Sequence, residues 1–293
     1  MRTSFIDTPK GPIFARHWGD ESLPRLLLLH GFPEYSGAWE ELAQRLKHKF
    51  HCIAPDQRGY GQTGGPDDVS AYTTSSLVKD MLHVIDDKPI TVLGHDWGAA
   101  VAYGLAMSKP DLVQKLIIAN GVHPAPFQRE MASGGPQSVA SQYILSLRRA
   151  GSEDHYAQDN YARLQTLFSA KMDFDWFCGE KRAQYLTEWS RPGRLKTMIH
   201  WYRASPLKVA VPGEPITDLP ELPKDRLMIR CPHLLIWGAG DTALLPESTK
   251  GLEEYAPILT RITIPEADHW LAHQKPDEMA TAILNWVEDA KSA

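Results

Sequence analysis

The sequence predicts an α/β protein whose mostly parallel central sheet is flanked by helices and interrupted by an inserted helical segment. Short aliphatic runs alternate with segments of helical periodicity through the first half of the chain. This alternation stops near Ala125 and resumes after Cys231. Buried strands that alternate with helices are typical of a parallel sheet covered on both faces. At 293 residues the chain is long enough for one large domain that carries an insertion.

Aliphatic and β-branched runs bounded by turn residues mark the expected strands. They cover Arg25–Leu29, His51–Ala54, Ile90–Leu93, Lys115–Ala119, Leu234–Trp237 and Thr260–Ile264. Helical periodicity marks Trp39–Leu46, Thr74–Ile85, Gly98–Ser108 and a closing helix near Met279–Ala290. The helix over Gly98–Ser108 begins with small residues, which we expect to press against the sheet.

The interval between the two halves of the sheet is rich in tyrosine and tryptophan and contains no good candidate for a buried strand. A proline-rich stretch at its end indicates a stiff linker back to the sheet. Packing of a small subdomain accounts for most of these aromatic side chains. We expect residues 1–124 to form the first part of the core, residues 125–225 a helical cap, and residues 226–293 the second part of the core.

Composition and charge exclude several classes of function. The net charge of −5 provides no basic surface for nucleic acid or anionic lipid. No apolar run approaches the length of a signal peptide or a membrane span. The cysteines Cys52, Cys178 and Cys231 are widely spaced and form no CxxC pair, so we expect reduced thiols in a cytoplasmic protein. Association as a homodimer is compatible with the sequence.

The most specific motif is Gly94-His95-Asp96-Trp97-Gly98, which follows a predicted buried strand and precedes a predicted helix. A Gly-x-nucleophile-x-Gly turn between a strand and a helix is the nucleophile elbow, in which small flanking residues let the central side chain rise above the sheet. Asp96 as a plain helix N-cap is the alternative, but a cap does not explain the two flanking glycines. We therefore expect Asp96 to be a nucleophile.

An aspartate at the elbow restricts the chemistry. Its carboxylate, with an ordinary pKa of about 3.9, is ionised at neutral pH and needs no base to activate it. It can displace a leaving group at a saturated carbon to give an ester, which water can then hydrolyse. A serine in the same attack would form an ether that cannot be reopened. Asp96 therefore indicates opening of a C–O or C–halogen bond at sp3 carbon.

The first predicted strand ends in His30-Gly31-Phe32-Pro33. The glycine lets the backbone turn so that the Phe32 N–H faces the elbow, where with the Trp97 N–H it would form a two-donor oxyanion hole. A simple turn after a strand is the alternative for this motif in isolation. We expect His30 to orient this loop rather than to catalyse.

Chain order predicts the partners of the nucleophile, because in this arrangement an acid and then a histidine follow it. Asp241 follows the strand Leu234–Trp237, and His269 follows Thr260–Ile264. Asp241 would orient the imidazole of His269, whose other nitrogen would deprotonate water. Asp268 is a rival acid, but an adjacent residue seldom points the right way. His269 and His273 lack a third ligand, so we expect no metal and no cofactor.

Together these motifs resemble those of the epoxide hydrolases of the α/β-hydrolase fold, over nearly the whole chain. The resemblance implies a helical cap in which two tyrosines hold the epoxide oxygen. Tyr202, in His200-Trp201-Tyr202-Arg203, is similar to the second of these; Tyr143 matches the first more loosely, and Tyr156 or Tyr161 could take its place. The resemblance thus implies conversion of an epoxide and water to a diol. We expect substrate-binding roles for His30, Pro33, Trp201 and Trp270.

Two alternatives remain. Haloalkane and haloacetate dehalogenases use the same aspartate, but haloalkane dehalogenases have asparagine where Phe32 stands, and fluoroacetate dehalogenases have arginine in place of Trp97. The second alternative is a catalytically silent relative that only binds a ligand, although such a protein would need none of the catalytic residues. An ester trapped on Asp96 after replacement of His269 would separate an enzyme from a binder.

Overall fold

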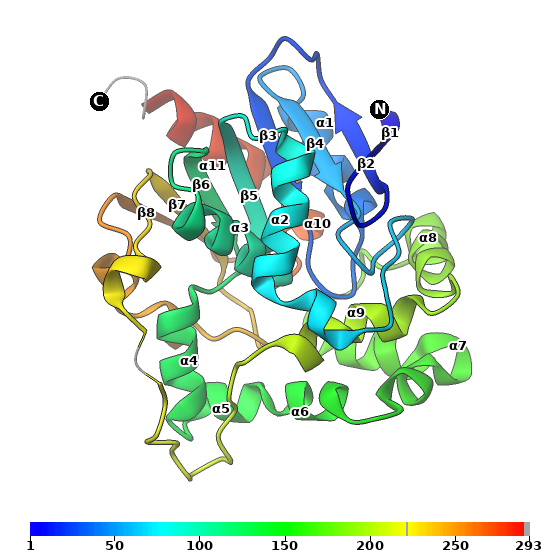
Figure 1. Cartoon of the computed structure of the whole chain (residues 1–293), viewed down its shortest axis with the longest axis vertical. Coiled ribbons are helices and arrows are strands. Elements are labelled where there is room, and N and C mark those ends of the chain that lie inside the picture. Colours follow the sequence, from blue (N-terminus) through cyan, green and yellow to red (C-terminus); the bar gives the residue numbers. More distant parts are fainter. Residues whose placement is uncertain (221, 290–293) are drawn as a thin grey trace.

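The computed structural model of the chain describes residues 1–220 and 222–289, and its central element is one eight-stranded sheet (Figure 1). The strand order is β1-β2-β4-β3-β5-β6-β7-β8. The strands are β1 (Arg2–Ile6), β2 (Ile13–Trp18), β3 (Arg25–Leu29), β4 (His51–Pro55), β5 (Ile90–His95), β6 (Val113–Ala119), β7 (His233–Gly238) and β8 (Leu259–Ile264). From β4 to β8 every neighbouring pair is parallel, whereas β2 pairs antiparallel with both β1 and β4. The predicted mostly parallel α/β sheet is confirmed.

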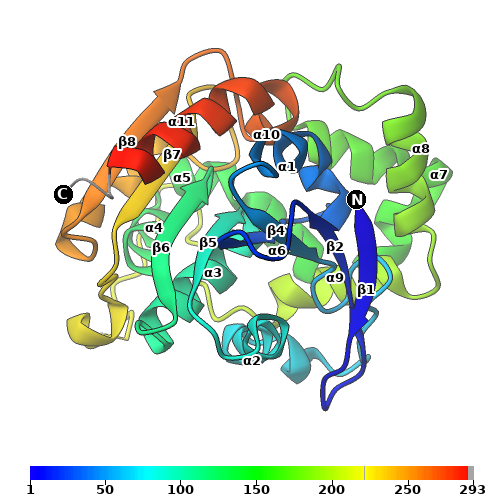
Figure 2. The same ribbon diagram turned by 90° about the horizontal axis from the view of Figure 1, so that it is seen from above.

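Helices cover both faces of this sheet (Figure 2). On one face lie α1 (Glu40–Leu46), α10 (Leu271–Gln274) and α11 (Pro276–Asp289), and on the other lie α2 (Thr74–Ile85) and α3 (Trp97–Ser108). Successive strand residues point to opposite faces. In β3, for example, Leu26 and Leu28 pack with the α1 and α11 side, while Leu27 and Leu29 pack with the α3 side. Burial on both faces is the reason that central strands such as β3 and β7 are nearly continuous aliphatic runs.

The interval predicted to be helical lies beyond the carboxyl ends of the parallel strands, in the lower part of Figure 1. Its helices are α4 (Pro124–Ala132), α5 (Pro136–Ala140), α6 (Gln142–Arg148), α7 (Ser152–Ser169), α8 (Gly179–Trp189) and α9 (Arg194–Ala204). The backbone of α7 is non-helical over residues 158–161. The division of the chain into domains at residues 124/125 and 225/226 stays a prediction.

Two features depart from the expected elements. The hairpin of β1 and β2 was not predicted, because β1 is short and largely exposed and β2 contains Arg16 and His17. The closing helix begins at Pro276, earlier than expected, and its predicted end at Ala290 lies outside the described residues. Among the residues that the structure describes, no helix is both long and apolar enough to cross a membrane.

Candidate active site

Asp96 occupies the turn between β5 and α3, with φ 49° and ψ −121°. A positive φ is unusual for a residue other than glycine, and such strain persists only where the surroundings enforce it. Both flanking glycines are needed for close packing. A Cβ on Gly94 would lie 2.6 Å from the Gly98 carbonyl oxygen, and one on Gly98 would lie 2.0 Å from the Leu29 carbonyl oxygen. The turn therefore holds the Asp96 side chain at the edge of the sheet.

The loop after β3 approaches this side chain directly. The Phe32 N–H donates a hydrogen bond of 2.7 Å to Asp96 Oδ1. Gly31 has no room for a side chain, since a Cβ there would lie 2.3 Å from the Cβ of Asp96. Trp97 is the first residue of α3, so its N–H has no carbonyl partner within the helix. The backbone N–H groups of Phe32 and Trp97, which the sequence analysis expected to form an oxyanion hole, thus flank Asp96.

His269 joins two carboxylates at the centre of the site. Its Nδ1 lies 2.7 Å from Asp241 Oδ2, and its Nε2 lies 3.8 Å from Asp96 Oδ2. Burial alone would lower the pKa of His269, but Asp241, through its charge and hydrogen bond, and then Asp96 outweigh it and raise that pKa to about 9. The same ion pair outweighs burial at Asp241 and holds its pKa below the usual range. The imidazole is therefore protonated at neutral pH, beside the ionised carboxylate of Asp241.

Asn120, which the sequence analysis did not single out, holds Asp241 in place. Its side-chain amide donates to Asp241 Oδ2 at 2.8 Å, and its Oδ1 accepts the Gly238 N–H at 2.7 Å. The backbone N–H groups of Ala243 and Leu244 donate to Asp241 Oδ1 at 2.8 and 2.9 Å. Asn120 directly follows β6, and this position at the carboxyl end of a parallel strand was the signal that could have found it.

A second cluster of buried polar side chains contacts the backbone of His269. His95 Nε2 lies 2.8 Å from the His269 carbonyl oxygen, and His95 Nδ1 lies 3.1 Å from Glu34 Oε2. Glu34 also contacts His273 Nε2 at 2.8 Å and accepts the Tyr185 hydroxyl at 3.0 Å. Burial raises the pKa of Glu34, but hydrogen bonds from His273 and His95 outweigh it and hold that pKa well below its ordinary value. His273 therefore belongs to a hydrogen-bonded network.

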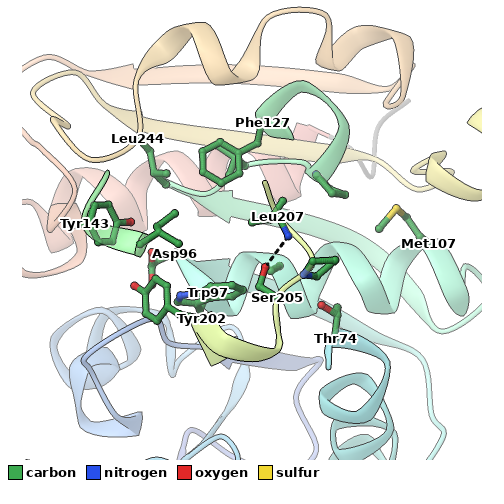
Figure 3. Close-up of a pocket in the computed structure, with 15 residues that line it drawn as sticks. Thr74, Asp96, Trp97, Met107, Phe127, Tyr143, Tyr202, Ser205, Leu207 and Leu244 are labelled. Atoms are coloured by element: carbon green, nitrogen blue, oxygen red, sulfur yellow. Dashed lines mark hydrogen bonds between the residues drawn. The ribbon is translucent and has the colours of Figure 1, made fainter. Parts of the chain in front are cut away.

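A cavity of about 270 Å³ opens over Asp96 and Trp97 (Figure 3). Tyr143 from α6 and Tyr202 from α9 line it, with ring centroids 6.2 Å apart. Figure 3 places both phenols beside Asp96, on elements outside the sheet. The Tyr202 ring packs edge-on against Phe32 and Trp97, each at 5.1 Å between ring centroids. Burial raises the pKa of both tyrosines, so both phenols stay protonated at neutral pH.

The rival tyrosines lie elsewhere, outside the lining of this cavity. The Tyr156 hydroxyl lies 2.9 Å from the hydroxyl of Ser146, and the Tyr161 hydroxyl donates to the Trp189 carbonyl oxygen at 3.0 Å. The structure thus brings Tyr143, and neither rival, into the cavity over Asp96.

The other residues expected to bind substrate support the site from outside the described cavity lining. His30 Nδ1 lies 3.0 Å from the Gly31 carbonyl oxygen, which fits the expected role of His30 in orienting the loop.

The other three residues contact tryptophan or histidine side chains or a backbone carbonyl group. The carbonyl oxygen of Pro33 accepts the indole N–H of Trp189, at 2.6 Å. The indole N–H of Trp201 donates to the Arg58 carbonyl oxygen at 2.9 Å. Trp270 packs against His269 with ring centroids 4.6 Å apart. Their substrate-binding role stays a prediction.

Within residues 1–220 and 222–289, no group of three or more histidine, cysteine, aspartate or glutamate side chains is arranged to hold a metal ion.

The sequence of the chain is similar to those of known proteins. A family model described as the alpha/beta hydrolase fold matches residues 24–276. The chain is 31% identical to AB hydrolase superfamily protein YfhM of Bacillus subtilis (strain 168), over 99% of both chains. It is 28% identical to Epoxide hydrolase 4 of Homo sapiens, over 92% of this chain and 74% of the human protein.

Solved structures of epoxide hydrolases are similar over nearly the full length. One, of the alpha/beta hydrolases superfamily and found in metagenomes from hot environments, superposes with a TM-score of 0.87 at 32% identity and covers 98% of each chain. The Bacillus megaterium epoxide hydrolase in complex with an inhibitor superposes with a TM-score of 0.85 at 28% identity, covering 97% of this chain and 100% of that one.

Proposed function

Because the chain belongs to the alpha/beta hydrolase fold family, we propose that it is an epoxide hydrolase, which converts an epoxide and water to a vicinal diol through an ester on Asp96. The observation that carries the proposal is the pairing of an aspartate nucleophile with two protonated phenols across one cavity. The relatives named epoxide hydrolases support it.

In the first half-reaction the Asp96 carboxylate attacks one carbon of the epoxide. The C–O bond breaks, its electron pair goes to the oxygen, and an ester forms between Asp96 and the substrate. Tyr143 and Tyr202 donate hydrogen bonds to that oxygen, and one of them supplies the proton that makes it a hydroxyl. The tyrosinate then takes up a proton from the His269 imidazolium, and a water molecule relays this proton. His269 is then neutral.

In the second half-reaction His269 removes a proton from water, and the resulting hydroxide attacks the ester carbonyl carbon of Asp96. The Phe32 and Trp97 N–H groups stabilise the oxyanion that develops. Collapse of the tetrahedral intermediate breaks the ester bond, the diol leaves with the remaining proton, and Asp96 is a carboxylate again. His269 ends the cycle protonated, as it began.

The charges around His269 favour its proposed protonation state in each of the two half-reactions. In the resting enzyme two carboxylates stabilise the imidazolium. Ester formation removes the charge of Asp96, so the pKa of His269 falls and the imidazole becomes a base when water has to be activated. The chemistry of the first step thus prepares the second.

The test is diol formation from styrene oxide by the wild type, beside Asp96→Ala and His269→Gln. We expect diol from the wild type, none from Asp96→Ala, and an adduct of the substrate mass on Asp96 in His269→Gln by intact-protein mass spectrometry. Turnover of an epoxide with no adduct in His269→Gln would refute the ester route.

The dehalogenase alternative is tested in parallel with fluoroacetate and a bromoalkane. Halide release without diol would retain Asp96, Asp241 and His269 in their roles and remove the epoxide assignment. The double variant Tyr143→Phe, Tyr202→Phe adds an independent check, because epoxide opening should nearly stop without both phenols. Full activity of that variant would also contradict the proposal.

A further inference from the structure

The cavity over Asp96 follows one face of α3. Trp97, Ala100 and Met107 line it, and their spacings of three and seven residues place them on the same side of the helix. At a rise of 1.5 Å per residue, the ten steps from Trp97 to Met107 span about 15 Å. In Figure 3 Asp96 and Tyr143 lie at one end of the cavity, and Thr74 and Met107 lie at the other. The cavity is therefore a channel along α3.

Asp96 lies at the inner end of this channel. It immediately precedes α3, and the groups behind it, Phe32 and His269, are buried and lie outside the channel lining. The opposite end reaches the surface, because Thr74 there is exposed. An epoxide at Asp96 thus has room for a substituent in one direction.

The walls of the channel are largely apolar. Ala100, Val122, Phe127, Leu207 and Leu244 contribute to them, and the polar Ser205 lies between the two ends, where its hydroxyl accepts the Leu207 N–H. The described lining contains no lysine, arginine or histidine. A buried carboxylate on the substrate would therefore lack a counter-charge, at a cost that strongly disfavours it.

The volume of the cavity limits the size of the substrate that the channel can hold. A cavity of about 150 Å³ in another protein accommodates benzene, with its six carbon atoms. The 270 Å³ here scale to about eleven non-hydrogen atoms. That is the size of a ten-carbon 1,2-epoxyalkane.

We infer that the site selects uncharged terminal epoxides that bear one unbranched apolar substituent, up to about ten carbons in all. The inference rests on the proposed epoxide hydrolase function and specifies its substrate class. A terminal epoxide places its oxirane at Asp96 and its chain along α3, whereas an internal epoxide needs space on both sides of the nucleophile.

The first test compares two isomers of equal size and composition, 1,2-epoxyoctane and trans-4,5-epoxyoctane, with the wild-type protein. We expect kcat/KM for the terminal isomer to exceed that for the internal one by about 100-fold or more, since misplacement of the reacting atoms by about 1 Å costs that much. Equal values, or preference for the internal isomer, would overturn the inference while leaving the epoxide hydrolase function intact. Absence of diol from both isomers and from styrene oxide, with Asp96-dependent halide release, would overturn the function instead.

Chain length supplies the second test. From 1,2-epoxybutane to 1,2-epoxydecane, kcat/KM should rise by up to about fourfold for each added CH₂, the value for complete burial. Beyond about ten carbons it should level off, because further carbons pass the mouth of the channel. A flat profile over the shorter chains would contradict a channel along α3.

Ala100→Leu narrows the channel one turn from Trp97. Its loss of kcat/KM should be at least about tenfold greater for 1,2-epoxydecane than for 1,2-epoxybutane, as expected from several lost CH₂ contacts. Ser108→Leu is the matched control, since it enlarges a side chain in the last turn of the same helix but outside the lining. Its chain-length profile should parallel that of the wild type. If Ala100→Leu does not fold, Met107→Trp should move the plateau to shorter chains, and an unchanged plateau would refute the channel.

Discussion

Replacing Asp96 by Asn should lower the pKa of His269 toward the ordinary value for histidine. Asn keeps the size of the side chain and an oxygen for the Phe32 N–H, but it removes the charge that lies 3.8 Å from His269 Nε2. It therefore imitates the charge state of the proposed ester. The pKa of His269 in the wild type, about 9, includes the attraction of Asp96 after that of Asp241.

The size of the change follows from the distance. Two unit charges separated by 3.8 Å interact by about 4 kcal/mol at an effective dielectric constant of about 20. At about 1.4 kcal/mol for each pH unit, this corresponds to a decrease of up to about three pH units. The imidazole of the variant would then titrate at a pH as low as about 6, close to the ordinary value for histidine.

The assay is an NMR titration of the histidine Cε1–H signals in wild type, Asp96→Asn and the control Asp268→Asn. Asp268 is adjacent to His269, but its carboxylate accepts the backbone N–H groups of Trp270 and Asp173. We therefore expect a much smaller change in the control. A His269 pKa in Asp96→Asn that stays at the wild-type value would refute the charge argument, and with it the proposed switch from imidazolium to base.

Three further predictions concern the surroundings of the site. Gly31→Ala places a Cβ 2.3 Å from that of Asp96, so kcat/KM should fall by about 100-fold, with a thermal midpoint that shows the fold is kept; unchanged kinetics would contradict the close approach. Asn120→Ala leaves the Gly238 N–H buried without its partner, so urea denaturation should show a free energy of unfolding lower by about 1–3 kcal/mol. Burial lowers the pKa of His233 to about 3, so the unfolded chain takes up a proton below pH 6.5 that the folded chain does not. Stability should therefore fall with acidification by up to about 1.4 kcal/mol per pH unit, and His233→Gln should reduce that slope, which a thermal titration measures.

Local patterns were sufficient for the parallel strands of the sheet and for the residues at their carboxyl ends. Most parallel strands are short aliphatic or β-branched runs followed by turn residues, and parallel strands bring their carboxyl ends to one edge. Asp96, Asp241 and His269 each follow such a strand, so their order along the chain predicted their meeting. The N-terminal hairpin was missed because an exposed edge strand carries little hydrophobic signal.

Contacts between distant segments depended on the tertiary structure. Asn120 and Asp241 are 121 residues apart and Glu34 and His273 are 239 apart, and no local pattern encodes either pair. That Tyr143 rather than its rivals lies beside Asp96 likewise depends on how α6 packs over the sheet, because helical periodicity does not say which tyrosine faces Asp96.

The chemistry of the site and its specificity thus have different origins. The residue types and their order predict an aspartate nucleophile with a histidine and an acid, since a strand end delivers its side chain through backbone geometry alone. The channel along α3, its inner end at Asp96 and its apolar walls arise where α3, α4, α6 and the segment after α9 pack together. Such a surface is a product of side-chain packing between separate elements, and only the folded chain defines it.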